Sequence, residues 1–219
     1  METEVKLAFK DRESLFSAAS SEWFVSHCKN PDSKPMTLEN YYLDTADRSL
    51  GLRGVSLRKR HYTSDDDDYY EFTAKCKGEV KGGIHNHFEW NLKCSSGILD
   101  LDSFKRKAEG DDRDLLNDVL NGITCDALTV LCSNTFERTY YDFRYQNSSM
   151  EACIDYGEIK DSNGRPCDLI CEIELELKKG TIEDLEDAKI RIVDGFGAVP
   201  FDETKLARTL RASKSGGSV

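Results

Sequence analysis

LICEIELELK, residues 169–178, alternates between apolar and acidic side chains. Successive side chains of a β-strand point to opposite sides, so such a segment has two chemically different faces. The two faces carry Ile173, Leu175 and Leu177 on one side and Glu172, Glu174 and Glu176 on the other. Like charges lined up on one face repel each other unless cations lie opposite. The stretch therefore predicts a strand with one face for an apolar core and one for cations.

The same period of two recurs along most of the chain. The first segment, residues 2–9, places Glu2, Glu4 and Lys6 on one face. Further segments of this kind are 37–43, 55–63, 69–77, 85–93, 128–145 and 150–156. Residues 128–145 are long enough for two strands. All these segments, together with 169–178, predict about eight strands, which is enough to close a barrel.

Helical patterns lie between these strands. They cover residues 11–28, 99–121, 181–194 and 203–212, and the second is long enough for two helices. Thr181 followed by Asp184 is typical of a helix start, because the threonine hydroxyl caps the first turn and an acid there favours its dipole. The acidic run at 64–68 predicts a solvated hairpin tip rather than a cation site. No repeat or linker is visible, so we expect one domain over 1–212 and a flexible tail over 213–219.

The polar faces of the predicted strands separate into acidic and basic ones. Basic faces carry Arg58 and Arg60 or Lys75 and Lys77, and His85 and His87 share a face with Glu89. Two arrangements remain open. The charged faces are solvated on the outside, with ion pairs worth a few tenths of a kcal/mol, or the barrel is inverted and they line a polar tunnel. Three observations favour the tunnel. The amphipathic helices need an apolar surface to cover, and like charges aligned on one strand face need neutralising partners. In addition, acidic and basic residues lie largely on different strands.

Composition excludes several classes of protein. The formal net charge of the 219 residues is −11, which disfavours nonspecific nucleic-acid or membrane binding. The eight cysteines form no CxxC pair, and we expect reduced, mostly buried thiols. No apolar stretch reaches the roughly 18 residues of a membrane span, and the acidic start differs from a secretory signal. We therefore expect a cytosolic protein.

Ordered motifs carry a resemblance to a known family. They are ExExK (Glu2, Glu4, Lys6), YLDT at 42–45, SLRKR at 56–60, FTAK ending at Lys75, Arg138, ACIDYG at 152–157, EIELELKKG at 172–180 and TKL at 204–206. This series resembles the CYTH family of triphosphate tunnel metalloenzymes from residue 2 to about 208. The resemblance implies an α+β fold, an eight-stranded antiparallel β-barrel with a charged interior and helices outside.

The resemblance also implies roles for individual residues. Phosphate-binding positions match Lys6, Arg58, Arg60, Lys75, Arg138 and Lys205, and metal-binding positions match Glu2, Glu4, Asp155, Glu172 and Glu174. Of these, Glu4, Lys6, Arg58 and Lys205 are the expected catalytic residues, and Lys205 resembles the lysine that closes over the substrate. Oxygen ligands suit Mg²⁺ or Mn²⁺. Arg58 and Arg60 in surface salt bridges, or Lys205 as an exposed helix residue, are the alternatives.

The implied activity is metal-dependent hydrolysis of a linear triphosphate. Similarity to the short single-domain members predicts inorganic tripolyphosphate, cleaved to diphosphate and phosphate by a monomer or homodimer that binds neither nucleic acid nor membrane. Alternatives are a thiamine-triphosphatase, a nucleoside triphosphatase, an adenylate cyclase of the class IV type, or a noncatalytic polyphosphate-binding module. No aromatic box for an organic group is evident. Relief of acidic crowding predicts that Glu4→Gln leaves the fold intact or more stable.

One departure from the family pattern concerns the middle strand. The family tends to carry Arg-x-Glu where this chain has His87, Phe88 and Glu89. Histidine is only partly charged at neutral pH, so this change predicts altered affinity, pH optimum or substrate choice. His85 and His87 without a clear third ligand disfavour zinc.

Overall fold

Long antiparallel strands form the framework of the computed structural model, which describes residues 2–76, 80–106, 108, 110–161 and 163–215. They are β1 (Glu2–Ala8), β2 (Met36–Thr45), β3 (Val55–Thr63), β4 (Asp68–Cys76), β6 (Ile84–Cys94), β7 (Leu128–Tyr145), β8 (Ser148–Lys160) and β9 (Pro166–Lys179). Each lies where period two predicts a strand. Residues 128–145 form one long strand rather than two, and the acidic run at 64–68 lies in the hairpin between β3 and β4.

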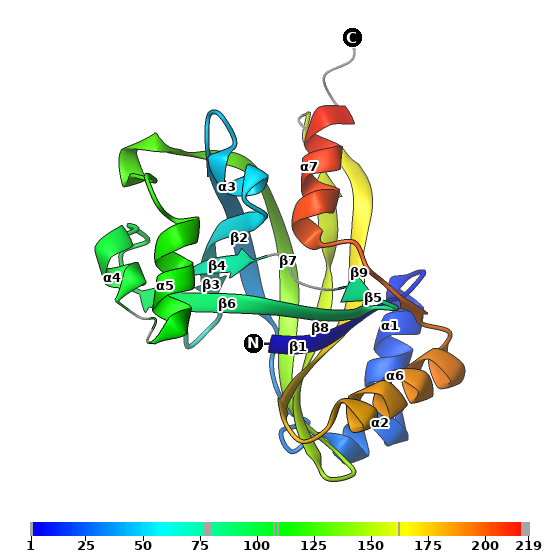
Figure 1. Ribbon diagram of the computed structural model, residues 1–219. Helices are drawn as coiled ribbons and strands as arrows, with labels where there is room; N and C mark the ends of the chain where they lie inside the picture. The colour runs from blue at the N-terminus through cyan, green and yellow to red at the C-terminus, as the bar shows by residue number, and fades with distance from the viewer. Residues whose placement is uncertain (1, 77–79, 107, 109, 162, 216–219) are drawn as a thin grey trace.

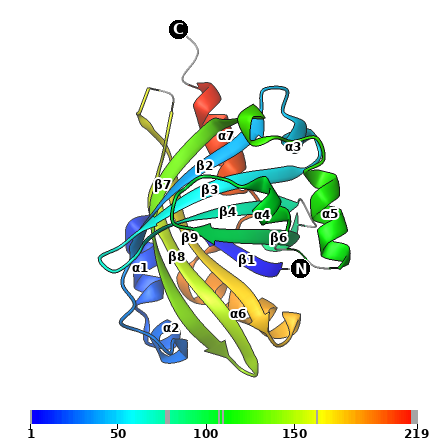
Figure 2. The same cartoon turned by 90° about the vertical axis from the view of Figure 1, so that its left-hand side faces the viewer.

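The sheet closes on itself. The long strands follow the order β1-β9-β8-β7-β2-β3-β4-β6, and β6 pairs back with β1 through Glu2 opposite His87 and Val5 opposite Ile84. Figure 2 shows the strands of this barrel fanned around one axis. The short strands β5 (Val80–Lys81) and β10 (Val199–Pro200) flank the closure. The predicted eight-stranded antiparallel barrel is confirmed.

Gly83 lies beside this closure. Its φ of 80° is in the left-handed region, and its carbonyl accepts a hydrogen bond from the Lys6 backbone N–H at 2.9 Å. A Cβ here would come within 2.9 Å of the Lys6 carbonyl oxygen, so the close approach of the two segments requires glycine.

Helices pack outside the barrel or at its end. They are α1 (Arg12–Ala19), α2 (Glu22–His27), α3 (Ser49–Leu52), α4 (Leu101–Lys105), α5 (Asp111–Val119), α6 (Ile182–Phe196) and α7 (Lys205–Ser215), with a 3₁₀ turn at Cys125–Ala127. The helix predicted over 11–28 is split, because Ser21 caps a second helix by accepting from the Phe24 N–H. Thr181 caps α6 through the Asp184 N–H, as predicted. Helix α7 includes residues 213–215, where the sequence predicts a tail, and 216–219 lie outside the described residues.

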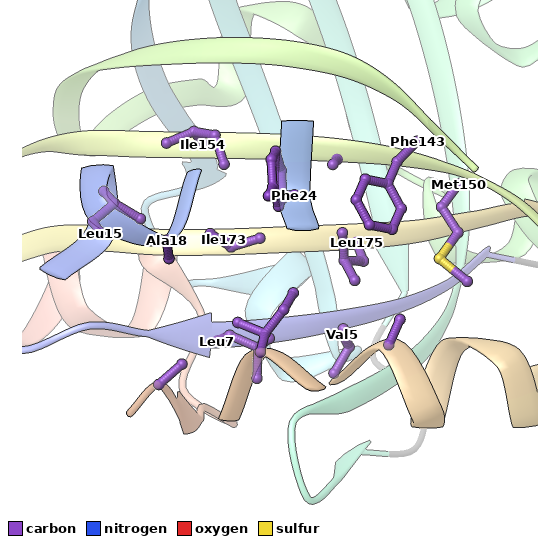
Figure 3. Packing of buried hydrophobic residues seen from close by; sticks show 14 of the residues in the cluster. Val5, Leu7, Leu15, Ala18, Phe24, Phe143, Met150, Ile154, Ile173 and Leu175 are labelled. Atoms are coloured by element: carbon purple, nitrogen blue, oxygen red, sulfur yellow. The ribbon is translucent and has the colours of Figure 1, made fainter. Parts of the chain in front are cut away.

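The apolar strand faces point outward, under the helices. Figure 3 shows Val5, Leu7, Ile173 and Leu175 of β1 and β9 beside Leu15 and Ala18 of α1 and Phe24 of α2. The same buried cluster includes Leu185, Ala188 and Ile192 of α6. A second cluster joins β3, β4 and β6 to α4 and α5, which lie together on another side of the barrel in Figure 1. Both clusters leave the charged faces on the inside, as in the inverted arrangement.

Helix α7 covers one end of the barrel. There the inward positions become apolar, since Leu38, Tyr62 and Phe136 form a buried cluster that includes Ala212 of α7. Each lies two residues from an inward polar side chain on its strand, and therefore shares its face. The barrel thus has one end closed by apolar packing. None of the described helices is long and apolar enough to cross a membrane.

The apolar core between the outer face of the barrel and the helices allows a direct test of this arrangement. Leu175 is fully buried, so Leu175→Ala should lower the free energy of unfolding by about 2–5 kcal/mol through lost apolar contact and a cavity. Leu52, 83% exposed, is the matched control, and Leu52→Ala should change it by less than about 0.5 kcal/mol. Urea unfolding followed by circular dichroism measures both, and equal effects would contradict the outward core.

Candidate active site

A cavity of ≈ 960 Å³ lies inside the barrel and is lined by charges of both signs. Most of the predicted site residues face it: Glu2, Glu4, Lys6, Arg58, Arg60, Lys75, Arg138, Glu174 and Lys205. Asp155 and Glu172 do not line the cavity, because both are buried behind it. The alternative of solvated outer faces is therefore wrong, and the site is a tunnel that holds acids and bases together.

Lys6 joins the acidic residues of two strands. Its Nζ is 2.7 Å from Glu4 Oε1 and 3.0 Å from Glu174 Oε1, which lies opposite Lys6 in the register of β1 and β9. Burial alone would lower the pKa of Lys6, but Glu174 and Glu4 outweigh it and raise the pKa above its usual value. Burial would likewise raise the pKa of Glu4, yet Lys6 and Lys75 lower it to about 2. All three groups are therefore charged at neutral pH.

A second, deeper cluster surrounds Lys205 at the start of α7. Its Nζ lies 2.8 Å from Asp155 Oδ2, 2.6 Å from Glu172 Oε2 and 2.9 Å from Glu174 Oε1. Arg138 binds Asp155 through two nitrogens at 2.6 and 2.5 Å and reaches Glu174 at 2.5 Å. Lys205 is 8% exposed, so it is not an ordinary surface lysine.

Arg208 completes this cluster and was not predicted from the sequence. Its Nη1 lies 2.5 Å from Glu172 Oε1, and its Nε lies 3.0 Å from Asp168 Oδ2. It follows Lys205 by three residues, a spacing that puts two side chains on the same side of a helix. If Lys205 is taken as a site residue, this spacing in the sequence indicates Arg208 as a second one.

Arg58 and Arg60 differ from the other cations of the tunnel. Among the described residues neither forms an ion pair with a carboxylate. Arg60 Nε donates to Asn40 Oδ1 at 2.6 Å, and Arg58 Nη2 donates to Thr73 Oγ1 at 3.0 Å. Arg58 Nε is buried and has no hydrogen-bond partner within the described parts of the chain. Their interpretation as surface salt bridges is wrong, and both guanidinium groups remain available to an anion.

The wall formed by β6 adds Glu89, which the sequence did not single out as a ligand. Lys75 Nζ lies 2.6 Å from Glu89 Oε2, 3.6 Å from Glu4 Oε1 and 4.0 Å from Glu2 Oε2. His87 Nε2 lies 3.1 Å from Glu2 Oε2. Burial would raise the pKa of Glu89, but His87 and Lys75 hold it well below its usual value. Lys75 is thus paired with acids rather than free.

Glu176 lies opposite Glu4 in the register of β1 and β9 and faces the cavity. Its carboxylate contacts Lys178 Nζ at 2.7 Å. Burial is the largest influence on it and, with the charges of Glu2 and Glu151, raises its pKa to about 6 despite Lys178. Glu176 is therefore the crowded acid of the tunnel, whereas Glu4 is neutralised.

The carboxylates of Asp155, Glu172 and Glu174 could hold a divalent metal ion. One oxygen of each lies within 4.8 Å of the others. An all-oxygen donor set suits a hard cation such as Mg²⁺ or Mn²⁺. Glu2 and Glu4, the other predicted ligands, lie nearer to Lys75 and His87, so the structure divides the predicted metal-binding set into two groups.

Tyrosines also face the cavity, although no aromatic box is evident in the sequence. Tyr62 and Tyr69 are stacked with ring centroids 4.5 Å apart, and Tyr140 and Met36 also line the cavity. Arg60 lies over the Tyr62 ring at 5.5 Å. The tyrosines come from three different strands, which explains why no local motif indicates them.

Comparison with known proteins agrees with this geometry. A family model described as the CYTH domain matches residues 1–209. An inorganic triphosphatase of Haemophilus influenzae is 30% identical over 150 residues, which are 68% of this chain and 38% of the relative. The chain thus spans less than half of the length of that relative.

Solved structures share the fold. A protein from Hippeastrum, described as an adenylyl cyclase with a dominant triphosphatase activity, has a TM-score of 0.67 at 15% identity, covering 100% of this chain and 98% of that one. A protein from Bacillus halodurans, described as an adenylate cyclase, has a TM-score of 0.56 at 21% identity, covering 95% and 96%. At these identities the likeness concerns the fold alone.

The contrast between Glu4 and Glu176 generates a paired prediction for metal-free protein. The pKa of Glu4 is lowered from 4.5 to about 2, so its ionised form stabilises the fold above pH 4.5, and this stabilisation is lost as the pH falls towards 2. Glu4→Gln should therefore lower the free energy of unfolding at pH 7.5 by about 3 kcal/mol. This replaces the expectation from the sequence that Glu4→Gln is neutral or stabilising.

Glu176→Gln should have the opposite effect. The pKa of Glu176 is raised from 4.5 to about 6, so its ionisation destabilises the fold increasingly as the pH rises from 4.5 to 6, and fully above that. The variant should be more stable by about 1–2 kcal/mol at pH 7.5, and the gain should vanish below pH 4.5. Urea unfolding with a chelator at both pH values measures the two variants, and shifts of the same sign at pH 7.5 would refute the charge assignment.

Proposed function

Because the chain belongs to the CYTH family, we propose that it hydrolyses a linear triphosphate with the help of a divalent metal ion. Inorganic tripolyphosphate, cleaved to diphosphate and phosphate, is the proposed substrate. The inorganic triphosphatase from Haemophilus influenzae supports this choice. A cytosolic location and a monomeric or dimeric state remain predictions.

The observation that carries the proposal is the state of Arg58 and Arg60. Both point into the tunnel, and neither has a carboxylate partner among the described residues. A buried guanidinium nitrogen without a hydrogen-bond partner is costly, and Arg58 Nε is such an atom. A phosphate oxygen supplies the missing acceptor, and the planar guanidinium binds phosphate through paired nitrogens. The acidic protein thus keeps two of its arginines for an anionic ligand.

The remaining cations support the binding of a long, highly charged anion. Tripolyphosphate carries roughly four to five negative charges near neutral pH. Lys6, Lys75 and Arg138 face the same cavity as Arg58 and Arg60, so several phosphoryl groups can be contacted together. Phosphoryl transfer depends mainly on positioning and charge neutralisation, and these residues hold the chain extended and stabilise charge on its oxygens.

The carboxylates of the tunnel are the proposed ligands of the metal ion. A bound Mg²⁺ or Mn²⁺ would neutralise phosphate oxygens and orient water. We assign its binding to the deep acids Asp155, Glu172 and Glu174. Glu2 and Glu4, which the sequence predicts as ligands of the same ion, lie beside Lys75 and His87 instead. Lys205 contacts three of the deeper acids. We therefore propose that it turns to the substrate when a cation replaces it.

Triphosphates with an organic end are the second candidate substrates. Tyr62, Tyr69 and Tyr140 line the cavity, and aromatic rings can stack on a base or a thiazolium ring. This favours ATP or thiamine triphosphate, as a hydrolase or as a cyclase of ATP. A noncatalytic polyphosphate-binding module would need the arginines but not the acids, and the tunnel has both.

Phosphate release from tripolyphosphate, ATP and thiamine triphosphate tests this proposal, each with Mg²⁺, with Mn²⁺ and with chelator. Arg58→Gln should lower kcat/KM for tripolyphosphate at least about a hundredfold, because it removes charge aimed at the transferred group. Arg144→Gln, on the exposed side of β7, is the matched control and should stay near wild type.

Two results would contradict the proposal. Hydrolysis that is equal with metal and with chelator would exclude metal-dependent chemistry. If Arg58→Gln were as active as Arg144→Gln, Arg58 would have no role in binding or hydrolysis of the substrate. A preference for ATP or thiamine triphosphate would retain the chemistry but change the substrate assignment.

A further inference from the structure

Glu2, His87 and Glu89 form a compact cluster on the tunnel wall, apart from the deeper acids. One ligand atom of each lies within 4.8 Å of the others. His87 Nε2 is 3.1 Å from Glu2 Oε2 and 3.6 Å from Glu89 Oε2. This group contains a nitrogen donor, whereas the group of Asp155, Glu172 and Glu174 contains only oxygens.

The backbone fixes this cluster. Glu2 lies directly opposite His87 where β1 pairs with β6, at the closure of the barrel. His87 and Glu89 lie two residues apart on β6 and therefore share its inner face. His87 is only 6% exposed. A half-buried donor set on paired strands costs little conformational entropy to assemble, as a binding site requires.

We propose that Glu2, His87 and Glu89 bind a divalent transition-metal ion of the zinc or cobalt type in preference to Mg²⁺. Imidazole suits such ions, whereas Mg²⁺ prefers oxygen ligands and retains its waters. Two carboxylates and one imidazole leave at least one position open for water or a phosphate oxygen. The existence of the site is independent of the proposed function, and only its contribution to triphosphate binding rests on it.

The proposed site differs from the histidine pair that the sequence suggests. From the sequence, His85 and His87 form a candidate pair that lacks a third ligand. In the structure His85 Nε2 lies 3.1 Å from the Phe201 carbonyl oxygen, so His85 is engaged elsewhere. The partners of His87 are carboxylates, and Glu2 is distant from it in sequence.

Lys75 neutralises part of the negative charge of this cluster. Its Nζ lies 2.6 Å from Glu89 Oε2, and its side chain is 30% exposed towards the cavity. A metal ion that binds Glu89 replaces this ammonium group, because both require the same carboxylate. Lys75 then becomes free to contact a phosphate, so binding of the metal and of the anion is mutually supportive.

Cobalt titration of the metal-stripped protein tests the site. The visible absorption of Co²⁺ reports its ligands directly and needs no enzyme activity. We expect Co²⁺ to bind, Zn²⁺ to displace it, and a hundredfold excess of Mg²⁺ to leave it bound. His87→Asn should weaken Co²⁺ binding at least about tenfold. His85→Asn, two residues away on the same face, is the control and should bind Co²⁺ as wild type does.

Zinc X-ray absorption of the wild-type protein provides a second measurement that needs no variant. One imidazole nitrogen in the first shell supports the site, and an oxygen-only shell overturns it. Equal Co²⁺ affinity of His87→Asn and His85→Asn also overturns it, and means that a protonated His87 serves as the cation of this corner. Mg²⁺-dependent hydrolysis without a nitrogen-bound metal contradicts this site alone, whereas a nitrogen-bound metal without hydrolysis contradicts the proposed function alone.

Discussion

The bridge from Lys6 to Glu4 and Glu174 shows the constraint on which the whole structure depends. Charged groups removed from water must be paired, because an isolated buried charge is far more costly than a buried pair. Lys6 joins β1 to β9. Lys205 of α7 and Arg138 of β7 both contact acids of β8 and β9. Lys75 of β4 contacts acids of β1 and β6. These pairs hold the acidic strands together, so the barrel keeps charges inside without collapsing.

The placement of the helices follows from this inversion. With their charged faces directed inward, β1 and β9 present apolar side chains to the outside, where α1, α2 and α6 cover them. The position of these helices outside the barrel, visible in Figure 1, therefore follows from the polar interior. Helix α7 has a different role, since it closes one barrel end through Ala212 and delivers Lys205 and Arg208 to the deep acids.

The sequence was sufficient for the strands, because period two and charge segregation are local signals. Ordered motifs also identified most of the charged residues that face the tunnel, but they did not indicate Glu89 or the tyrosines, and two of the predicted residues, Asp155 and Glu172, do not line the cavity. The sequence could not predict how the charges pair, because Glu2 contacts His87 only after β1 pairs with β6, and Arg208 contacts Glu172 only after α7 packs on the barrel. Helix α3 was missed for a similar reason: Asp44, at the end of β2, accepts hydrogen bonds from the Leu50 and Gly51 N–H groups. Its cap lies in a strand rather than next to the helix.

The central claim is that this charged interior exists to bind a triphosphate, and a crystal structure with a non-hydrolysable imidotriphosphate tests it most directly. The account predicts phosphate density inside the barrel, within hydrogen-bond distance of Arg58 and Arg60, with the Arg58 Nε donating to a phosphate oxygen. Phosphate density confined to the outer surface, with both guanidinium groups unchanged, would contradict it.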